Sequence, residues 1–108
     1  MKRFYRPDEV ADLLRLSRRT IYRMVGRGDL ESIRFGTGSI RIPASALPPE
    51  ALGMGRLERP LETARRIGMS VSSVYRLYHE GRLPGVMIGE GEYTLRIISG
   101  SEPVGKAE

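Results

Sequence analysis

The sequence contains no cysteine and only one histidine, His79. Without cysteine the chain has no disulfide framework, thiolate zinc site or cysteine nucleophile, and one histidine cannot form a histidine metal site. No apolar run approaches the ~20 residues that span a bilayer. The basic amino terminus lacks a following apolar segment, so we expect no signal peptide. We therefore expect a cytoplasmic protein without enzymatic activity, cofactor, small-molecule ligand or membrane partner.

Lysine is also scarce, although the chain is basic. Lys and Arg total 18 against 13 Asp and Glu, which gives a net charge of +5, and only Lys2 and Lys106 are lysines. Arginine is favoured where a planar donor meets phosphate or a guanine edge. Residues 1–57 hold 11 basic and 6 acidic residues, whereas residues 58–108 hold 7 of each. The excess of positive charge therefore belongs to the first half.

The chain contains an internal repeat. A shift of 53 residues aligns residues 6–42 with 59–95 without a gap, with 11 identities in 37 positions. The identities include paired glycines that are typical of turns, and apolar residues match at most other core positions. We interpret the repeat as two copies of one structural unit.

Each copy has the pattern helix, helix, β-hairpin. In the first, Pro7 suits the first position of a helix, Ser17 is a good N-cap for a second helix, and Gly28 suits its left-handed end. Alternation in residues 32–42 predicts a hairpin with its turn at Gly36, Thr37 and Gly38. The residues that we expect in the core of the first copy are Val10, Leu13, Leu14, Ile21, Met24, Val25, Ile33, Phe35, Ile40 and Ile42, and we assign the other methionines to the core as well.

The predicted fold class is α+β, with two tandem small winged helix-turn-helix units. The first unit covers residues 1–47 and a Pro/Gly linker covers residues 48–58. The second, divergent unit covers residues 59–98, with Val74, Leu77 and Tyr78 inside, and residues 99–108 form a flexible tail. Each unit alone is near the lower size limit for a stable domain.

The predicted second helix of the first unit has a basic outer face. With Ile21 and Met24 buried, the side chains on the opposite side are those of Arg18, Arg19, Tyr22 and Arg23. Arginines near the start of a helix oppose its dipole, and an anionic partner would offset that cost. A helix of this kind after a tight turn is typical of proteins that enter the major groove of DNA.

The hairpin supports the same interpretation. A two-residue turn at Thr37 and Gly38 would place Arg34 directly opposite Arg41 on the outer face. Like charges facing each other across a ladder are destabilising, and a phosphate would offset the repulsion. The hairpin is therefore predicted to act as the wing.

The first unit, Tyr5 to Pro43, resembles the excisionase-type and MerR-like winged helix family. The resemblance rests on Pro7–Ala11, Leu16–Arg23, Gly28–Leu30 and Arg41–Pro43. It implies binding of double-stranded DNA, with a recognition helix in the major groove and a wing on the backbone or in the minor groove. Recombination directionality factors and transcription regulators are among the members. The second unit, Arg59 to Ile98, resembles the family more loosely.

This sequence departs from the family in its duplicated unit and in the absence of the dimerisation helix of MerR-type regulators. Glu90 and Glu92 at the second wing would repel phosphate. The second unit either contacts DNA weakly, or is a protein–protein adaptor or oligomerisation module, or completes the core. Partners besides DNA are a further copy of the chain, a recombinase or a polymerase, and we expect nucleoid association. The candidate DNA-binding residues are Ser17, Arg18, Arg19, Thr20, Tyr22, Arg23, Arg34, Thr37, Arg41, Ser72, Ser73, Tyr75, Arg76 and Arg82.

Overall fold

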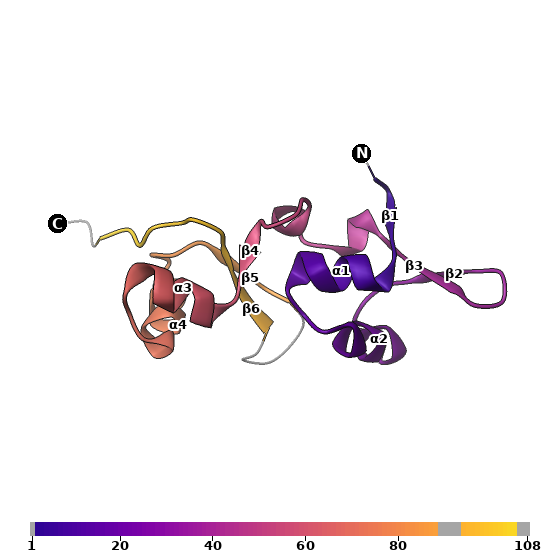
Figure 1. Ribbon diagram of the computed structural model, residues 1–108, viewed down its shortest axis with the longest axis horizontal. Coiled ribbons are helices and arrows are strands. Elements are labelled where there is room, and N and C mark those ends of the chain that lie inside the picture. The colour runs from indigo at the N-terminus through magenta and orange to yellow at the C-terminus, as the bar shows by residue number, and fades with distance from the viewer. Residues whose placement is uncertain (1, 89–93, 106–108) are drawn as a thin grey trace. The chain divides into compact units, whose positions relative to one another are not determined.

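The computed structural model describes residues 2–88 and 94–105. The chain divides into two compact units, Met1–Met54 (unit 1) and Gly55–Glu108 (unit 2). The division falls inside the segment 48–58, which the sequence predicts as a linker. In each unit a short strand precedes two helices and two further strands, as Figure 1 shows.

Both units combine helices with one small antiparallel sheet, so the α+β class is confirmed. In unit 1 the strand order is β1-β3-β2, and in unit 2 it is β4-β6-β5. The first strand of each sheet was not expected from the sequence, because two residues are too few to show alternation. The elements of unit 1 are β1 (Phe4–Tyr5), α1 (Pro7–Leu14), α2 (Arg18–Gly26), β2 (Ile33–Phe35), β3 (Ser39–Pro43) and the 3₁₀ turns Ala44–Ala46 and Pro49–Ala51. Those of unit 2 are β4 (Leu57–Glu58), α3 (Pro60–Ile67), α4 (Val71–His79), β5 (Gly85–Met87) and β6 (Leu95–Ile98).

The helix starts follow from local sequence signals. Pro7 is the first residue of α1, as predicted, and the Glu9 carboxylate accepts a hydrogen bond from the Arg6 backbone N–H at 2.8 Å. Ser17 and Ser70 are the N-caps of α2 and α4, and each side chain accepts a backbone N–H three residues later. Such a cap stabilises a helix by about 1 kcal/mol.

The end of α2 is also the predicted one. Gly28 has φ +78°, and the Asp29 N–H donates to the Met24 carbonyl at 2.9 Å. This is the Schellman arrangement, in which a left-handed glycine turns the chain away and satisfies the last carbonyls. Gly81 (φ +73°) ends α4 in the same way.

The core of each unit lies between the helices and one face of its sheet. The predicted apolar residues of α1 and α2 are buried apart from Val25, which is half-buried, and Val74 and Leu77 are buried in α4. The expectation that Ile33 and Phe35 face the core is wrong, since both are exposed. The assignment of all methionines to the core is wrong as well, because the exposed methionines include Met54, Met69 and Met87.

The two hairpins differ in length. Ile33 pairs with Arg41, and Val86 pairs with Arg96. Ile33 and Val86 are 53 residues apart in the sequence, whereas Arg41 and Arg96 are 55 apart. The sequence between the paired strands is therefore two residues longer in unit 2. The gap-free alignment therefore fails after the turn, and Arg96 corresponds to Arg41. Both guanidinium groups donate to the carbonyl of the preceding residue.

The segments predicted as linker and tail make backbone contacts. Ala51 is buried in unit 1, and β4 pairs with β6 in unit 2. The Ser99 N–H donates to the Arg56 carbonyl, and the Val104 N–H donates to the Arg82 carbonyl at 2.8 Å. Residues 99–105 are thus hydrogen bonded to unit 2, in contrast to the expected tail, because their Gly- and Pro-rich backbone finds partners on folding.

Candidate nucleic-acid interface

The turn between α1 and α2 positions the basic helix of unit 1. Arg15 ends α1 with a left-handed φ of 58°, and the Leu16 N–H donates to the Ala11 carbonyl at 2.9 Å. Ser17 then begins α2 by accepting the Thr20 N–H at 3.0 Å. Because Ile21 and Met24 are buried, the opposite side of α2 is held toward solvent.

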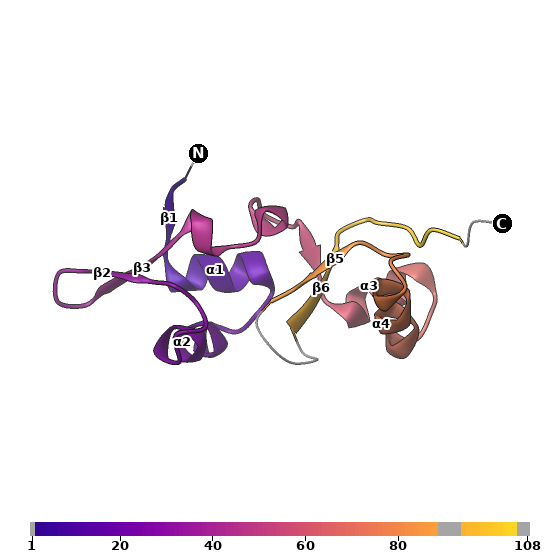
Figure 2. The same cartoon turned by 180° about the vertical axis from the view of Figure 1, so that it is seen from behind.

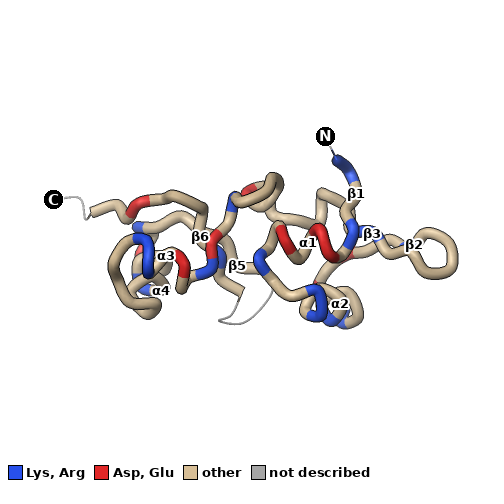
Figure 3. Tube along the Cα trace, viewed as in Figure 1, with Lys and Arg blue, Asp and Glu red and all other residues tan. Residues whose placement is uncertain are grey.

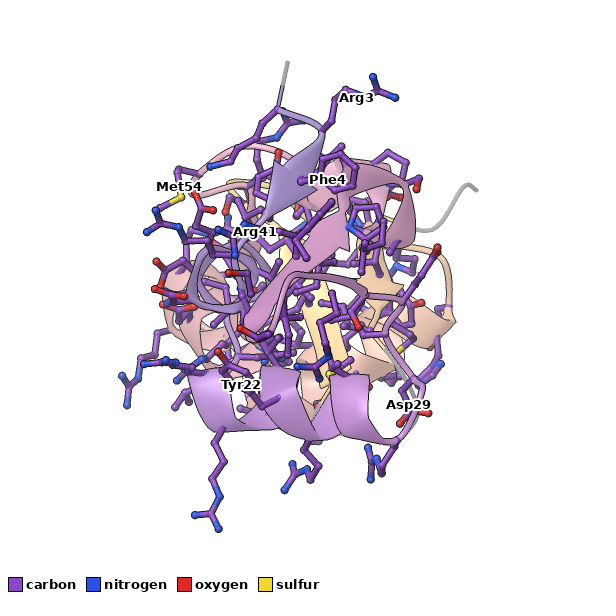
Figure 4. The ribbon with its side chains drawn as sticks, turned by 90° about the vertical axis from the view of Figure 1, so that its right-hand side faces the viewer. Arg3, Phe4, Tyr22, Asp29, Arg41 and Met54 are labelled. Carbon is purple, nitrogen blue, oxygen red and sulfur yellow. The ribbon has the colours of Figure 1, made fainter. Side chains whose placement is uncertain are left out.

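The outer face of α2 carries the predicted basic side chains. Arg18, Arg19 and Arg23 are exposed, and so is Tyr22, which lies on α2 in Figure 4. The Arg18 guanidinium carbon lies 5.5 Å from the centroid of the Tyr22 ring, within cation–π range. The pKa of Arg18 is raised, first by Tyr22 and then by the Asp8 carboxylate. Arg18 is therefore held in place while remaining charged.

The other arginines of this face have their donors available. Among the residues that the structure describes, no carboxylate forms an ion pair with Arg19 or Arg23. The first turn of α2 contains no acidic residue either. Positive side chains at the positive end of a helix dipole are unfavourable without an anion, and phosphate supplies one.

Ser17 and Thr20 serve the helix start. The Ser17 hydroxyl accepts the Thr20 N–H, and the two hydroxyl oxygens lie 2.8 Å apart. Ser17 is exposed and Thr20 is half-buried. These candidates therefore have a structural role, whether or not they also contact a ligand.

The structure corrects the register of the β2–β3 hairpin. Phe35 pairs with Ser39, so three residues, Gly36 to Gly38, form the loop instead of two. One added loop residue shifts the register by one, which places Arg34 opposite Ile40 and Arg41 opposite Ile33. The predicted arginine pair across the ladder is therefore wrong. Gly36 is the first residue of this loop and has a left-handed φ of +67°.

The same shift reverses the face of the sheet on which each side chain of β2 lies, compared with the prediction. Arg34 shares a face with Ile40 and with Ile42, which is buried in the core, but Arg34 itself is exposed. Figures 1 and 2 show why: the hairpin extends beyond both helices of unit 1. Thr37 lies exposed in the loop. Arg34 and Thr37 are thus accessible at the projecting end.

The outer sheet face of unit 1 carries two exposed aromatic side chains, Phe4 and Phe35. The rings of Phe4 and Phe35 meet edge to face with centroids 5.8 Å apart. Arg41 belongs to this face and is half-buried, its guanidinium donating to the Ile40 carbonyl at 2.9 Å. In Figure 4, Phe4 lies on the side of the sheet away from α2. Phe4 before the Pro7 helix start was the only sequence signal of this strand.

Figure 3 shows the acidic positions of α1 and the basic positions of α2 on two different helices of unit 1. A pocket of about 330 Å³ opens beside α1. Carboxylates in its lining make the pocket unsuitable for phosphate. Its lining residues are Tyr5, Glu9, Asp12, Leu13, Gly53 and Met54.

The candidates in unit 2 are less accessible. Ser73 and Tyr75 are half-buried, and Tyr75 packs against the core of the unit. Arg82 is half-buried and donates to the Val104 carbonyl at 2.8 Å and to Glu80 at 3.1 Å. Only Ser72 and Arg76 of the five are exposed. Glu90 and Glu92, on which the prediction of an acidic second wing rests, lie outside the described residues.

Comparison with known proteins finds a matching family for part of the chain. Residues 4–47, fewer than half of the chain, match the family of the helix-turn-helix domain. This match covers the elements of unit 1 through the first 3₁₀ turn and supports a helix-turn-helix DNA-binding family. No curated protein and no solved structure matches the chain. In the described part of the chain, every helix is too short to cross a membrane.

Proposed function

We propose that unit 1 is a winged helix-turn-helix that binds double-stranded DNA in a sequence-specific manner. The observation that carries this proposal is the outer face of α2, where the exposed Arg19 and Arg23 form no ion pair with a carboxylate of the described residues, while Ile21 and Met24 fix the inner face. An α-helix with such a face fits the major groove. The helix-turn-helix match over residues 4–47 supports the same conclusion.

The residues divide by role. Arg19 and Arg23 are proposed to contact base edges, since a guanidinium can bind O6 and N7 of guanine with two hydrogen bonds. Arg18 is proposed to bind phosphate beside the groove. Arg34 and Thr37 on the projecting hairpin would bind the backbone or enter the minor groove, with Arg41 at the base of the hairpin.

The cellular role that we propose is that of an excisionase-like architectural factor or a small transcription regulator, acting without a cofactor and without catalysis. A DNA partner implies a cytoplasmic, nucleoid-associated location. Sequencing the genomic fragments that the protein selects from a library would separate the two roles, because attachment sites favour the first and promoters the second.

We infer that unit 2 derives from the same ancestral unit as unit 1 and has acquired a different function. Its formal charge is close to neutral, with eight basic and seven acidic residues from Gly55 onward, whereas unit 1 has ten against six. The Arg82 guanidinium already donates hydrogen bonds to the Val104 carbonyl and the Glu80 carboxylate. These observations favour protein interaction over DNA binding as the function of unit 2.

The binding test uses equivalent arginines in the two units. Arg23→Ala should weaken binding to a selected duplex by ~1–3 kcal/mol and relax the preference at one base pair. Arg76→Ala removes the same charge from the equivalent position of α4 and should change affinity less than twofold. Fluorescence anisotropy with labelled duplex measures both effects.

Salt dependence gives a second readout. Five or six phosphate contacts by unit 1 predict a slope of log K against log salt of about −5, at ~0.9 per contact. A flat salt response would contradict DNA binding altogether. Equal losses for Arg23→Ala and Arg76→Ala would contradict the division of tasks between the units.

A further inference from the structure

The arginines of α2 differ in how their side chains are held. The Arg18 guanidinium carbon lies over the Tyr22 ring, 5.5 Å from its centroid. Residues four apart are neighbours on one helix face, so this contact forms within α2 alone. In the described part of the chain, no such ring contact involves Arg19 or Arg23. Arg18 is therefore the arginine of the exposed face whose guanidinium the helix itself restricts.

The tyrosine of this contact is placed differently in the two units. Tyr22 is 41% exposed. Its equivalent in α4, Tyr75, is half-buried and packs against the core of unit 2. The residue four positions earlier is Arg18 in unit 1 and Val71 in unit 2. The tyrosine thus lies beside a guanidinium where the helix begins with arginine, and against the core where the helix begins with valine.

The ring restricts Arg18 without neutralising it. No carboxylate of the described residues forms an ion pair with Arg18. Tyr22 has the largest effect on the raised pKa of Arg18, and the Asp8 carboxylate has a smaller one. A carboxylate partner would compete with phosphate for the N–H donors, whereas a ring face leaves those donors for another partner.

We propose that Tyr22 is a positioning residue, whose ring holds the Arg18 guanidinium where it binds a DNA phosphate at the start of α2. The proposal rests on the function proposed for unit 1. A long side chain loses conformational freedom when it is immobilised in a complex, and this loss lowers affinity. A guanidinium that is already held in the free protein loses less. Tyr22 therefore raises affinity for DNA through Arg18, without itself contacting the DNA.

Two substitutions of Tyr22 separate its ring from its hydroxyl group. Tyr22→Leu removes the ring and keeps a side chain that favours the helix. It should weaken binding of the full chain to a selected duplex by roughly threefold to tenfold, as expected when one long side chain must be ordered on binding. Tyr22→Phe keeps the ring and should bind within about twofold of the wild type. Fluorescence anisotropy measures both, and circular dichroism checks that the helix content is unchanged.

A double-mutant cycle tests whether Tyr22 acts through Arg18. Arg18→Ala should weaken binding at least as much as Tyr22→Leu. Adding Tyr22→Leu to Arg18→Ala should cause no further loss, because the ring then has no guanidinium to hold. Arg19→Ala is the matched control, since Arg19 is also exposed on α2 but has no ring contact in the described part of the chain. In that background Tyr22→Leu should weaken binding as much as it does in the wild type.

A measurement without DNA tests the contact itself. Nuclear Overhauser effects between the side-chain protons of Arg18 and the ring protons of Tyr22 should be present in the free full chain. They should persist in Tyr22→Phe. Because this readout does not depend on any ligand, it keeps the positioning role separate from the question of DNA binding.

Three results would overturn the proposal: absence of these Overhauser effects, additive losses in the cycle with Arg18→Ala, or equal losses for Tyr22→Phe and Tyr22→Leu. The last result would mean that the Tyr22 hydroxyl group contacts DNA directly. Additive losses in a wild type that binds DNA would reject the positioning role alone. A chain that shows the Overhauser effects but binds no duplex would instead reject the function proposed for unit 1.

Discussion

Units 1 and 2 place the same kinds of element at matching positions, yet they exchange the character of two surfaces. At the helix starts, Asp8 and Arg18 of unit 1 correspond to Leu61 and Val71 of unit 2. At a second surface, beside α1 and α3, the apolar side chains belong to unit 1 and the charged side chains to unit 2.

There, unit 1 has Tyr5 and Leu13, both lining the pocket beside α1. Unit 2 has Glu58 and Arg66 at the corresponding positions, and these form an ion pair at 2.8 Å. Helix caps, turn glycines and buried apolar residues are retained in both units. The difference teaches that a common framework fixes where the surfaces lie, while the side chains on them determine what each unit can bind.

The largest effect on stability that we expect from the comparison concerns a glycine of unit 2. A Cβ atom at Gly85 would lie 2.7 Å from the backbone oxygen of Arg96, which cannot move aside within the sheet. Gly85→Ala should therefore destabilise the protein by ~1–3 kcal/mol, as overpacking does. Unit 1 has the exposed Ser32 at the corresponding position, so Ser32→Ala should be nearly neutral. Urea denaturation measures both, and equal losses would show that the close contact with the Arg96 oxygen is not the cause of the destabilisation.

A smaller effect is expected where the first helix of each unit ends. Arg15 and Gly68 both have left-handed φ, 58° and 71°. Gly68→Ala should cost about 1 kcal/mol, because a side chain is unfavourable in this conformation. Arg15→Gly relieves the same strain and should leave stability unchanged or slightly higher. Thermal denaturation followed by circular dichroism provides the measurement, and a marked loss on Arg15→Gly would mean that the Arg15 side chain stabilises the turn of unit 1.

The smallest effect is a pH dependence that arises from Glu58 of unit 2 and has no counterpart at the equivalent position of unit 1. Burial opposes ionisation of Glu58, but hydrogen bonds from Arg66 and Thr63 outweigh it and hold the pKa below its ordinary value of 4.5. A lowered pKa stabilises the folded state above pH 4.5, and this contribution is lost as the pH falls through the pKa of the folded protein. Unit 1 has no acid at this position, since Tyr5 corresponds to Glu58.

Glu58→Gln should accordingly lower stability at pH 7 by less than ~1 kcal/mol, as expected for a partly exposed ion pair. It should also reduce the loss of stability below pH 4.5. Urea denaturation at pH 7 and pH 3.5 is the measurement, with Glu50→Gln at an exposed site as the control. An unchanged acid loss in Glu58→Gln would exclude this ion pair as its cause.

Local signals predicted much of the framework. The sequence placed Pro7 at the start of α1, Ser17 at the start of α2 and Gly28 at the end of α2, and each of these is confirmed. These predictions succeeded because caps and left-handed turns depend on bonds within a few residues. The exposed arginine face of α2 followed from the helical period once Ile21 was assigned to the core.

Features that depend on pairing between distant residues were not predictable in the same way. The register predicted for a two-residue turn at Thr37 and Gly38 put Ile33 and Phe35 on the wrong face of the sheet. The two-residue strands β1 and β4 are defined by their hydrogen bonds to β3 and β6 and by little else.

By itself, then, the sequence determined where the helices of unit 1 begin, where α2 ends, which side of α2 carries the arginines, and that the charge of the two halves differs. The tertiary structure decided the register of the hairpins, the exposed Phe4–Phe35 face, the hydrogen bonds that hold residues 99–105 within unit 2, and the exposure of Leu61, Met69 and Val71. The physical reason is that helix limits are set by neighbouring residues. Strand register and surface exposure are instead set by which distant segments pair, and one added loop residue reverses every side chain of β2 relative to β3.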